Sequence, residues 1–217
     1  MKIAVLGTGM VGNALATKLV NVGHQVMMGS RTADSTPAKD WKNAAGKGAQ
    51  IGTFADAATF GELIISCTNG AKSIAALRQA GAANLRGKIL IDVSNPLDMS
   101  QKPPTLVFCN TDSLGERIQR EFPESLVVKA LNTVNCDVMV NPALAPGNHT
   151  LFICGNNASA KARVLSFIAE NFGWKRENIV DLGDISNSRG TEMYLALWIR
   201  LWGKLGTPLF NIHIVRA

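Results

Sequence analysis

The stretch KIAVLGTGMVG at residues 2–12 decides the fold of this chain of 217 residues. A short apolar run ends in three glycines spaced as G-x-G-x-x-G, and an amphipathic run of helical spacing follows. In a strand–turn–helix unit, such glycines permit a tight turn, close approach of a pyrophosphate and close packing of the helix. The strand and helix flanks disfavour the alternative, a plain glycine turn. The stretch therefore predicts dinucleotide binding by Gly7, Thr8, Gly9, Met10, Val11 and Gly12.

The pattern that begins at residue 2 continues along the chain. Short β-branched runs alternate with Ala-rich runs of helical spacing, which is typical of parallel βαβ units. Strands are predicted at 2–6, 25–28, 49–53, 63–67, 88–93 and 126–130. Helices are predicted at 10–21, 36–45, 54–58, 73–80 and 113–122. The expected fold is α/β, with a Rossmann-type doubly wound parallel sheet.

The organisation changes beyond residue 132. A Pro/Gly loop at 141–148 precedes a strand at 149–154, a helix at 158–171, a strand at 178–182 and a final helix near 187–205. These elements predict a short C-terminal extension of the sheet with packing helices. We expect a single NADP-binding domain over 1–217, with a dinucleotide-binding core at 1–135. The extension at 149–217 is expected to form part of an acceptor site or a dimer interface.

The formal charge of +6 and the isoelectric point near 9.3 fit anionic partners, including nucleotide phosphates. The sequence contains no long basic block, no zinc-finger spacing and no basic stripe interleaved with aromatic residues. Nucleic acid is therefore not an expected partner. A basic surface that only keeps the protein soluble is the simpler interpretation.

The cysteines and the start of the chain predict a cytoplasmic protein. Cys67, Cys109, Cys136 and Cys154 form no C-x-x-C pair, so neither a disulfide framework nor a metal site is expected. They are predicted to be buried apolar residues in a reducing compartment. The first strand leaves no room for a signal peptide. Charged residues, glycines and Pro208 interrupt the apolar stretch at 193–210, which argues against a membrane span.

The end of the second predicted strand discriminates between NAD and NADP. An NAD-binding chain places an acid there for the ribose 2′-OH, whereas residues 27–32 read MMGSRT and the first acid is Asp34. Ser30 and Thr32 can donate hydroxyls, and Arg31 can clamp a phosphate or stack on adenine. We therefore predict NADP as cofactor, with Lys39 as a weaker second candidate for the 2′-phosphate. The alternative is that Arg31 is a solvated loop residue.

Ligands of open α/β sheets bind beyond the carboxyl ends of the strands. The residues expected there, after the fourth, fifth and sixth strands, are Thr68, Asn69, Ser94, Asn95, Pro96, Asn132 and Thr133. All are small and uncharged, so they can hold a nicotinamide carboxamide and ribose hydroxyls, although some of them must cap helices or close turns. None is an evident general acid or base at neutral pH. We predict hydride transfer by positioning, without a catalytic residue or metal.

Four basic side chains have structural interpretations beside functional ones. His24, His149 and His213 are scattered and are expected to be structural. Lys129 is the one charge inside an apolar strand. It is predicted either to line the site or to snorkel from the end of the strand.

The motifs KIAVLGTGMVG, MGSR at 28–31, DVSNPL at 92–97 and VKALNTV at 128–134 resemble the NADPH:deazaflavin (coenzyme F420) oxidoreductase family. They are also similar to the NADPH domains of ferric reductases with six membrane helices. The resemblance continues over 154–161 and 181–189, and implies a nicotinamide held by the loops after strands four to six. One departure is evident, because CTNG at 67–70 replaces the usual apolar Val-Pro.

The leading functional hypothesis is an NADPH-dependent oxidoreductase that passes hydride to a flavin-like or deazaflavin acceptor. The ferric-reductase resemblance lacks the membrane half, so a soluble acceptor is expected. A dehydrogenase similar to pyrroline-carboxylate reductase is an alternative, disfavoured because only one strong helix follows residue 181. A non-catalytic NADP sensor is another alternative.

The last predicted helix has a broad apolar face formed by Leu195, Trp198, Leu201, Trp202 and Leu205. This face either packs on the sheet of its own chain or pairs across a two-fold axis. We expect a homodimer whose interface includes Trp198 and Trp202.

Overall fold

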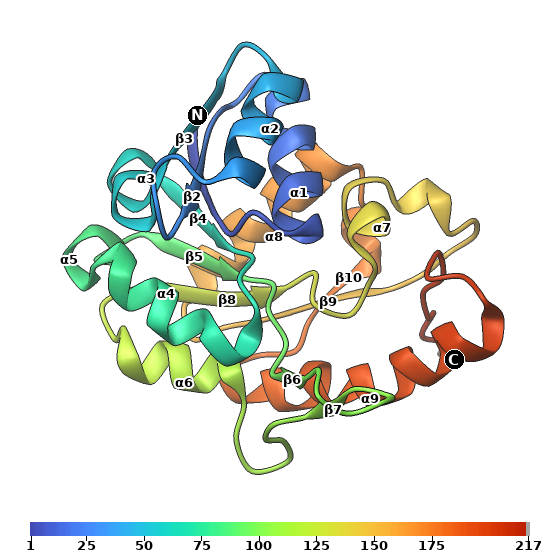
Figure 1. Ribbon diagram of the computed structural model, residues 1–217. Helices are drawn as coiled ribbons and strands as arrows, with labels where there is room; N and C mark the ends of the chain where they lie inside the picture. Colours follow the sequence, from blue (N-terminus) through green and yellow to red (C-terminus); the bar gives the residue numbers. More distant parts are fainter. Residues whose placement is uncertain (216–217) are drawn as a thin grey trace.

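The predicted doubly wound sheet is present in the computed structural model, which describes residues 1–215 (Figure 1). Eight strands follow the order β10-β9-β8-β5-β4-β1-β2-β3. Their bounds are β1 Lys2–Leu6, β2 Gln25–Ser30, β3 Ala49–Thr53, β4 Leu63–Ser66, β5 Ile89–Asp92, β8 Leu126–Ala130, β9 Leu151–Cys154 and β10 Ile179–Asp181. All pairs from β3 to β8 are parallel, so the carboxyl ends of six strands meet at one edge.

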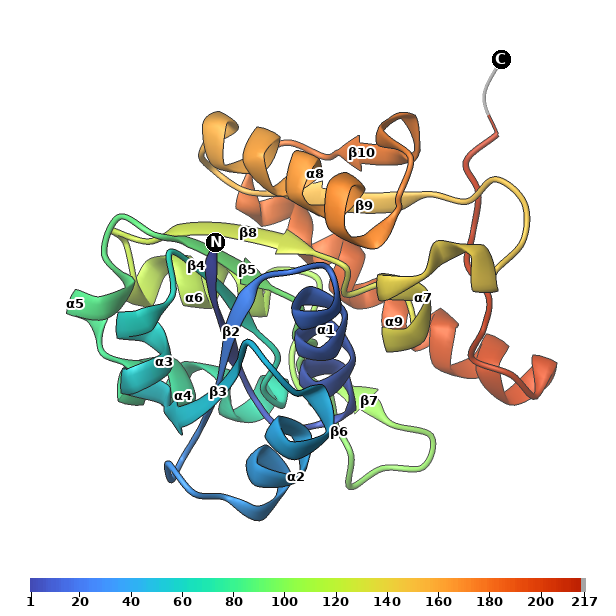
Figure 2. The ribbon, with the colours of Figure 1, turned by 90° about the horizontal axis from the view of Figure 1, so that it is seen from above.

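Helices cover both faces of this sheet (Figure 2). The longer elements are α1 Met10–Asn21, α2 Thr36–Ala45, α3 Phe54–Phe60, α4 Ser73–Ala80, α6 Leu114–Glu121, α8 Ala158–Phe172 and α9 Ser188–Leu205. Side chains alternate between the two faces of a strand. On one face of the sheet, Ile3 and Val5 of β1 pack in a core with α1, α2 and α8. On the other face, Ala4 and Leu6 pack in a core with α3, α4 and α6. Both cores are formed by the apolar faces that the sequence pattern predicts.

Several short elements were missed by the sequence pattern. They include α5 Ala82–Leu85, α7 Cys136–Val140 and a hairpin formed by β6 Leu97–Asp98 and β7 Thr105–Leu106. Each is too short to show a hydrophobic period. The hairpin and α7 lie in loops that leave the carboxyl edge, so they border the region where the ligand was expected.

The C-terminal extension adds β9 and β10 to the sheet, as predicted, but with reversed direction. Strand β9 runs antiparallel to β8, with Lys129 opposite Cys154, and β10 runs parallel to β9. The start of β9 therefore lies at the carboxyl edge of the parallel strands. Helix α9 then runs past α6 and the β6–β7 hairpin (Figure 1).

The aromatic face of α9 packs largely within its own chain. Trp198 is 8% exposed and stacks on Phe210, with ring centroids 5.4 Å apart. Trp202 is 47% exposed. The prediction that Trp198 lies in a dimer interface is therefore wrong, because Phe210 of the same chain covers this side chain.

The expectation of four buried cysteines was also wrong. Cys154 is buried, Cys67 and Cys136 are half-buried, and Cys109 is exposed in the loop before α6. All four are free thiols. Separately, none of the helices within residues 1–215 combines the length and apolar character needed to span a membrane.

Candidate functional site

The glycine loop connects β1 to α1 with three different local geometries. Gly7 has φ +124°, and a Cβ on it would lie 2.7 Å from the Cys67 carbonyl oxygen. A Cβ on Gly12 would collide with the Gly7 carbonyl oxygen, whereas a Cβ on Gly9 would meet no atom within 4 Å. Two glycines therefore allow strand, turn and helix to pack, and Gly9 leaves open space beside the backbone. This is the arrangement that a pyrophosphate requires.

The start of α1 offers unpaired donors toward that space. The first helical hydrogen bond runs from Asn13 N to the Gly9 carbonyl, so the N–H groups of the preceding helical residues have no partner within the helix. No side chain caps this end, and no acidic residue lies in the first turn. A hollow of about 660 Å³ opens here, lined by residues of the loop, α1 and α7. These features suit an anionic group, which the helix dipole also favours.

The end of β2 lies beside this loop, because Gly7 N donates to the Gly29 carbonyl at 3.0 Å. Ser30 is the last residue of the strand and is buried, and its hydroxyl donates to the Thr32 carbonyl at 2.5 Å. Its single proton is thus used to close the turn. Arg31 and Thr32 are exposed at the same edge. Lys39 pairs with Asp34 at 3.4 Å on the surface, which makes Arg31 the freer cation for a phosphate.

The loops after β4, β5 and β8 come together, as the sequence predicts. Asn95 and Asn132 form a reciprocal pair: Asn95 Nδ2 donates to the Asn132 carbonyl, and Asn132 Nδ2 donates to Asn95 Oδ1, both at 2.9 Å. A Cβ on Gly70 would collide with the Asn95 carbonyl, so the loop after β4 packs directly on the loop after β5. Bulk at Gly70 would therefore separate two loops.

Three buried polar atoms at this edge have no hydrogen-bond partner among the described residues. They are Ser66 Oγ, Asn132 Oδ1 and Thr133 Oγ1. Asn132 and Thr133 are each 2% exposed, and they follow Leu131, whose φ of +64° is uncommon for a non-glycine residue. An unsatisfied buried polar atom costs about 1–3 kcal/mol, so a ligand that supplies donors here gains binding energy. The residues therefore fit the nicotinamide half of NADP(H).

A buried ion cluster supports these loops from below. Lys129 Nζ lies 2.8 Å from Asp92 Oδ2 and 2.8 Å from Glu192 Oε1, and the three side chains are at most 3% exposed. Burial lowers the pKa of Lys129, but the charges of Asp92 and Glu192 more than offset this and hold the pKa above its usual value. Lys129 also donates to the Ser94 carbonyl at 2.5 Å. Both predictions for Lys129 were wrong, because it neither lines the site nor reaches solvent.

The same cluster attaches the C-terminal helix to the core. Glu192 of α9 accepts hydrogen bonds from Leu114 N at 2.8 Å and Gly115 N at 3.0 Å, at the positive end of α6. Arg189 of α9 also donates to both carboxylate oxygens of Glu116 on α6, which holds the pKa of Glu116 below its usual value. Sequence reasoning missed Asp92 and Glu192, because no local pattern brings residues 92, 129 and 192 together.

The histidines lie outside this site. His24 bonds to Asn171 Oδ1 at 2.7 Å, and His149 bonds to the Pro142 carbonyl and to Asn211 Nδ2, both at 3.0 Å. The structural interpretation of these two residues is confirmed. His213 is exposed near the end of the described chain.

Comparisons with known proteins agree with this geometry. A family model described as "NADP oxidoreductase coenzyme F420-dependent" matches residues 2–96. The F420-dependent NADP reductase of Methanocaldococcus jannaschii is 29% identical over 211 residues, covering 93% of this chain and 92% of that protein. Metalloreductase STEAP3 of Rattus norvegicus is 30% identical over 195 residues, covering 88% of this chain but 36% of that protein.

Solved structures extend the comparison. A crystal structure from Arthrobacter sp. FB24, described as a candidate F420-dependent NADP reductase, is 50% identical, covers all of both chains and has a TM-score of 0.93. A reductive aminase from Aspergillus terreus in complex with NADPH has a TM-score of 0.64 at 21% identity, which shows a shared fold alone. The fold, the site and these relatives define an NADP-dependent oxidoreductase. Within that class, the chain belongs to the F420-dependent NADP reductase family.

Proposed function

We propose that this enzyme transfers hydride between NADP(H) and a deazaflavin acceptor of the F420 type. The observation that carries the proposal is the 50% identity to the Arthrobacter protein over the full length of both chains. The similarity thus includes the C-terminal extension as well as the dinucleotide-binding core. Relatives named F420-dependent NADP reductase also match along 92% of their length.

In this proposal, each part of the carboxyl edge binds one part of the cofactor. The N–H groups at the start of α1 bind the pyrophosphate, and Arg31 binds the 2′-phosphate. Asn132 and Thr133 bind the nicotinamide half, and the Asn95–Asn132 pair holds their loops in place. The bound cofactor supplies the hydride, so the protein contributes position and a binding surface for the second ring.

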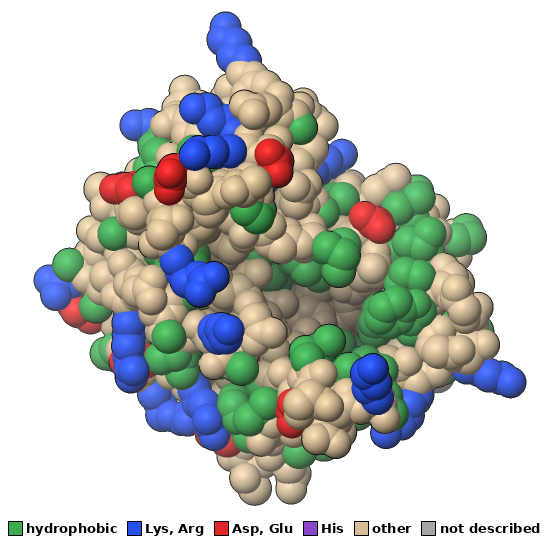
Figure 3. Space-filling model, viewed as in Figure 1, with side chains coloured by type: hydrophobic (Ala, Val, Ile, Leu, Met, Phe, Trp, Pro, Cys, Tyr) green, Lys and Arg blue, Asp and Glu red, His purple; other side chains and the backbone are tan. Residues whose placement is uncertain are grey.

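The acceptor is proposed to bind in the hollow at the centre of the face seen in Figure 3. Hydrophobic side chains gather along the margin of this hollow that is nearest to α7 and the end of α9 (Figure 3). Exposed apolar residues next to these segments include Leu144, which follows α7, and Leu209, which follows α9. We therefore assign the extension at 149–217 to the same single domain as residues 1–135, and to the acceptor side of the site.

The acceptor is tested by NADPH oxidation against F420, FMN, FAD, quinones and ferric chelates. We expect the highest kcat/KM with F420. The metalloreductase relatives make FAD and ferric chelates the informative competitors. A higher kcat/KM with FAD or a ferric chelate would replace F420 as the proposed acceptor. Binding of NADPH without its oxidation by any acceptor would indicate a sensor.

The same assay tests whether catalysis proceeds by positioning. No residue among the loop positions 68–69, 94–96 and 132–133 titrates near neutrality. The pH–rate profile with the best acceptor should therefore lack a steep bell near pH 7. A bell that disappears on changing one titratable residue, such as His149, would favour the dehydrogenase alternative.

We also propose a homodimer through the outer face of α9. Leu197, Trp202 and Leu205 are each about half exposed there, at 54%, 47% and 54%. Such a row of apolar side chains is typical of an interface. Light scattering at high micromolar concentration tests this directly, and a strict monomer would reject it.

A further inference from the structure

A row of three hydroxyl groups connects the buried ion cluster to the surface of the cofactor site. Thr68 Oγ1 lies 2.9 Å from Ser73 Oγ, and Ser73 Oγ lies 3.0 Å from Ser94 Oγ. Ser94 Oγ lies 2.7 Å from Asp92 Oδ1. Ser73 and Asp92 are fully buried and Ser94 is 5% exposed, so only Thr68 reaches the site.

The charge of Asp92 fixes the direction of every hydrogen bond in this row. Lys129 donates to Asp92 Oδ2, and Ser94 N donates to Asp92 Oδ1 at 3.1 Å, so the carboxylate is ionised and only accepts. Ser94 must then donate its hydroxyl proton to Asp92. Since a hydroxyl has one proton, Ser94 accepts from its other neighbour.

Ser73 is constrained in turn. Its two other neighbours, Ser94 Oγ and the Asn69 carbonyl at 3.3 Å, can only accept a proton from it. Its single proton is therefore used on one of these, and the bond to Thr68 must be donated by Thr68. The hydroxyl of Thr68 then presents only lone pairs toward the site.

The backbone of Thr68 lies beside the glycine loop. Thr68 lies two residues beyond the end of β4, and its backbone N would lie 3.3 Å from a Cβ on Gly7. We infer that Thr68 is an obligate hydrogen-bond acceptor for the nicotinamide half of NADP(H), which carries N–H donors on its carboxamide and O–H donors on its ribose. This inference rests on the proposed placement of the cofactor.

The family that this chain resembles usually has an apolar Val-Pro pair at this point, and such a pair has no hydroxyl to accept a hydrogen bond. The direction also depends on α9, because Lys129 is shared between Asp92 and Glu192. Helix α9 thereby helps to keep the Thr68 hydroxyl in the orientation in which it accepts a hydrogen bond.

Equilibrium binding of NADP+ to Thr68→Val and Thr68→Ser tests the contact without any acceptor, so its outcome is independent of the deazaflavin assignment. Valine keeps the shape and removes the hydroxyl. We expect Thr68→Val to weaken binding roughly tenfold and Thr68→Ser to restore it. Thr111→Val, at an exposed threonine in the loop before α6, is the matched control and should not change binding. Unchanged affinity in Thr68→Val would overturn the inference.

The 3-acetylpyridine analogue of NADP+, which replaces the amide nitrogen with a methyl group, identifies the donor. If the carboxamide donates, Thr68→Val should affect the analogue much less than NADP+. If a ribose hydroxyl donates, both should lose the same factor. Neutron diffraction from deuterium-exchanged crystals of the NADP+ complex then tests direction. The hydroxyl deuteron of Thr68 pointing toward Ser73 would support an obligate acceptor, and the hydroxyl deuteron of Ser73 pointing toward Thr68 would overturn it.

Discussion

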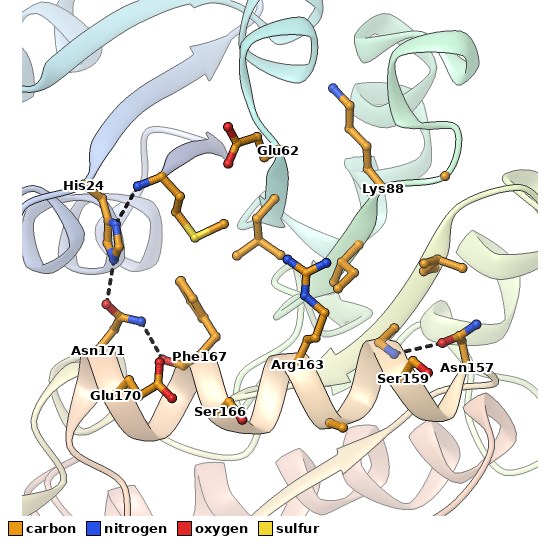
Figure 4. A pocket seen from close by; sticks show the side chains of 17 residues that line it. His24, Glu62, Lys88, Asn157, Ser159, Arg163, Ser166, Phe167, Glu170 and Asn171 are labelled. Atoms are coloured by element: carbon orange, nitrogen blue, oxygen red, sulfur yellow. Dashed lines mark hydrogen bonds between the residues drawn. The ribbon is translucent and has the colours of Figure 1, made fainter.

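The two edges of the central sheet each border a hollow, but their polar groups differ in kind. The amino edge has a cavity of about 720 Å³ between the sheet and α8 (Figure 4). There His24 bonds to Asn171 Oδ1 at 2.7 Å, and Lys88 Nζ donates to the Ala58 carbonyl at 2.7 Å. At the carboxyl edge, buried atoms of Asn132 and Thr133 have no partner among the described residues.

The difference teaches that size alone does not identify a binding site. At the amino edge, His24 and Lys88 already bond to the protein, so a ligand gains little from these two groups. At the carboxyl edge, the free N–H groups of α1 and the unsatisfied buried oxygens can form several hydrogen bonds with one ligand. The predictions below either separate the two edges further or show that they are alike.

The largest expected effect is on stability, and it compares one lysine from each edge. Lys129→Met leaves Asp92 and Glu192 buried without a cation, which should lower the free energy of unfolding by about 3–5 kcal/mol. Lys88→Met removes one hydrogen bond of a partly exposed lysine at the amino edge, and should cost about 1 kcal/mol. Urea denaturation of both variants measures the difference.

A triple variant checks the cause of that loss. Lys129→Met combined with Asp92→Asn and Glu192→Gln removes the charges together, and should regain at least roughly half of the lost stability. If the triple variant is no more stable than Lys129→Met, unpaired charge is not the reason for the loss.

The next effect separates two glycines of the carboxyl edge. Gly12→Ala should shift α1, because the new Cβ would collide with the Gly7 carbonyl. We expect the free energy of unfolding to fall by about 1–3 kcal/mol and the affinity for NADPH to fall by about a hundredfold. Gly9→Ala should leave stability unchanged and weaken NADPH binding by about tenfold, because its methyl group would enter the space proposed for the pyrophosphate. Calorimetric titration and thermal unfolding measure both.

Gly203→Ala is the control, since a Cβ there would meet nothing within 4 Å in a helix. It should stabilise the protein by about 0.5–1 kcal/mol without changing cofactor affinity. Equal effects of Gly9→Ala and Gly12→Ala on stability would contradict the open space beside Gly9.

A smaller effect is expected at the end of β2. Loss of a charge-assisted hydrogen bond costs about 1.5–3 kcal/mol, so Arg31→Ala should weaken NADPH about ten- to a hundredfold and hardly change NADH. Lys39→Ala should change NADPH affinity less than about threefold, because Lys39 already pairs with Asp34. Equal affinities of the unmutated protein for NADPH and NADH would refute the assignment of Arg31.

Much of this edge could be predicted from sequence, because its signals are local. The spacing of Gly7, Gly9 and Gly12 and the missing acid after residue 28 each lie within a few residues. The ion cluster could not, because Asp92, Lys129 and Glu192 lie on three elements whose packing depends on the tertiary fold. The reversed direction of β9 likewise follows from the long loop that precedes it, which the strand pattern does not describe.

The smallest expected effect is at the amino edge, and it completes the comparison. Arg163 lies exposed on α8 and lines the cavity there (Figure 4). Arg163→Ala removes the same guanidinium as Arg31→Ala, at the opposite end of the strands. Because we propose that the cofactor binds at the carboxyl edge, the dissociation constant for NADPH and the turnover number should both stay within about twofold of the unmutated enzyme. Titration of NADPH and steady-state kinetics with the best acceptor measure these quantities. A loss of affinity comparable with that of Arg31→Ala would show that the amino-edge cavity takes part in cofactor binding, and the distinction between the two edges would fail.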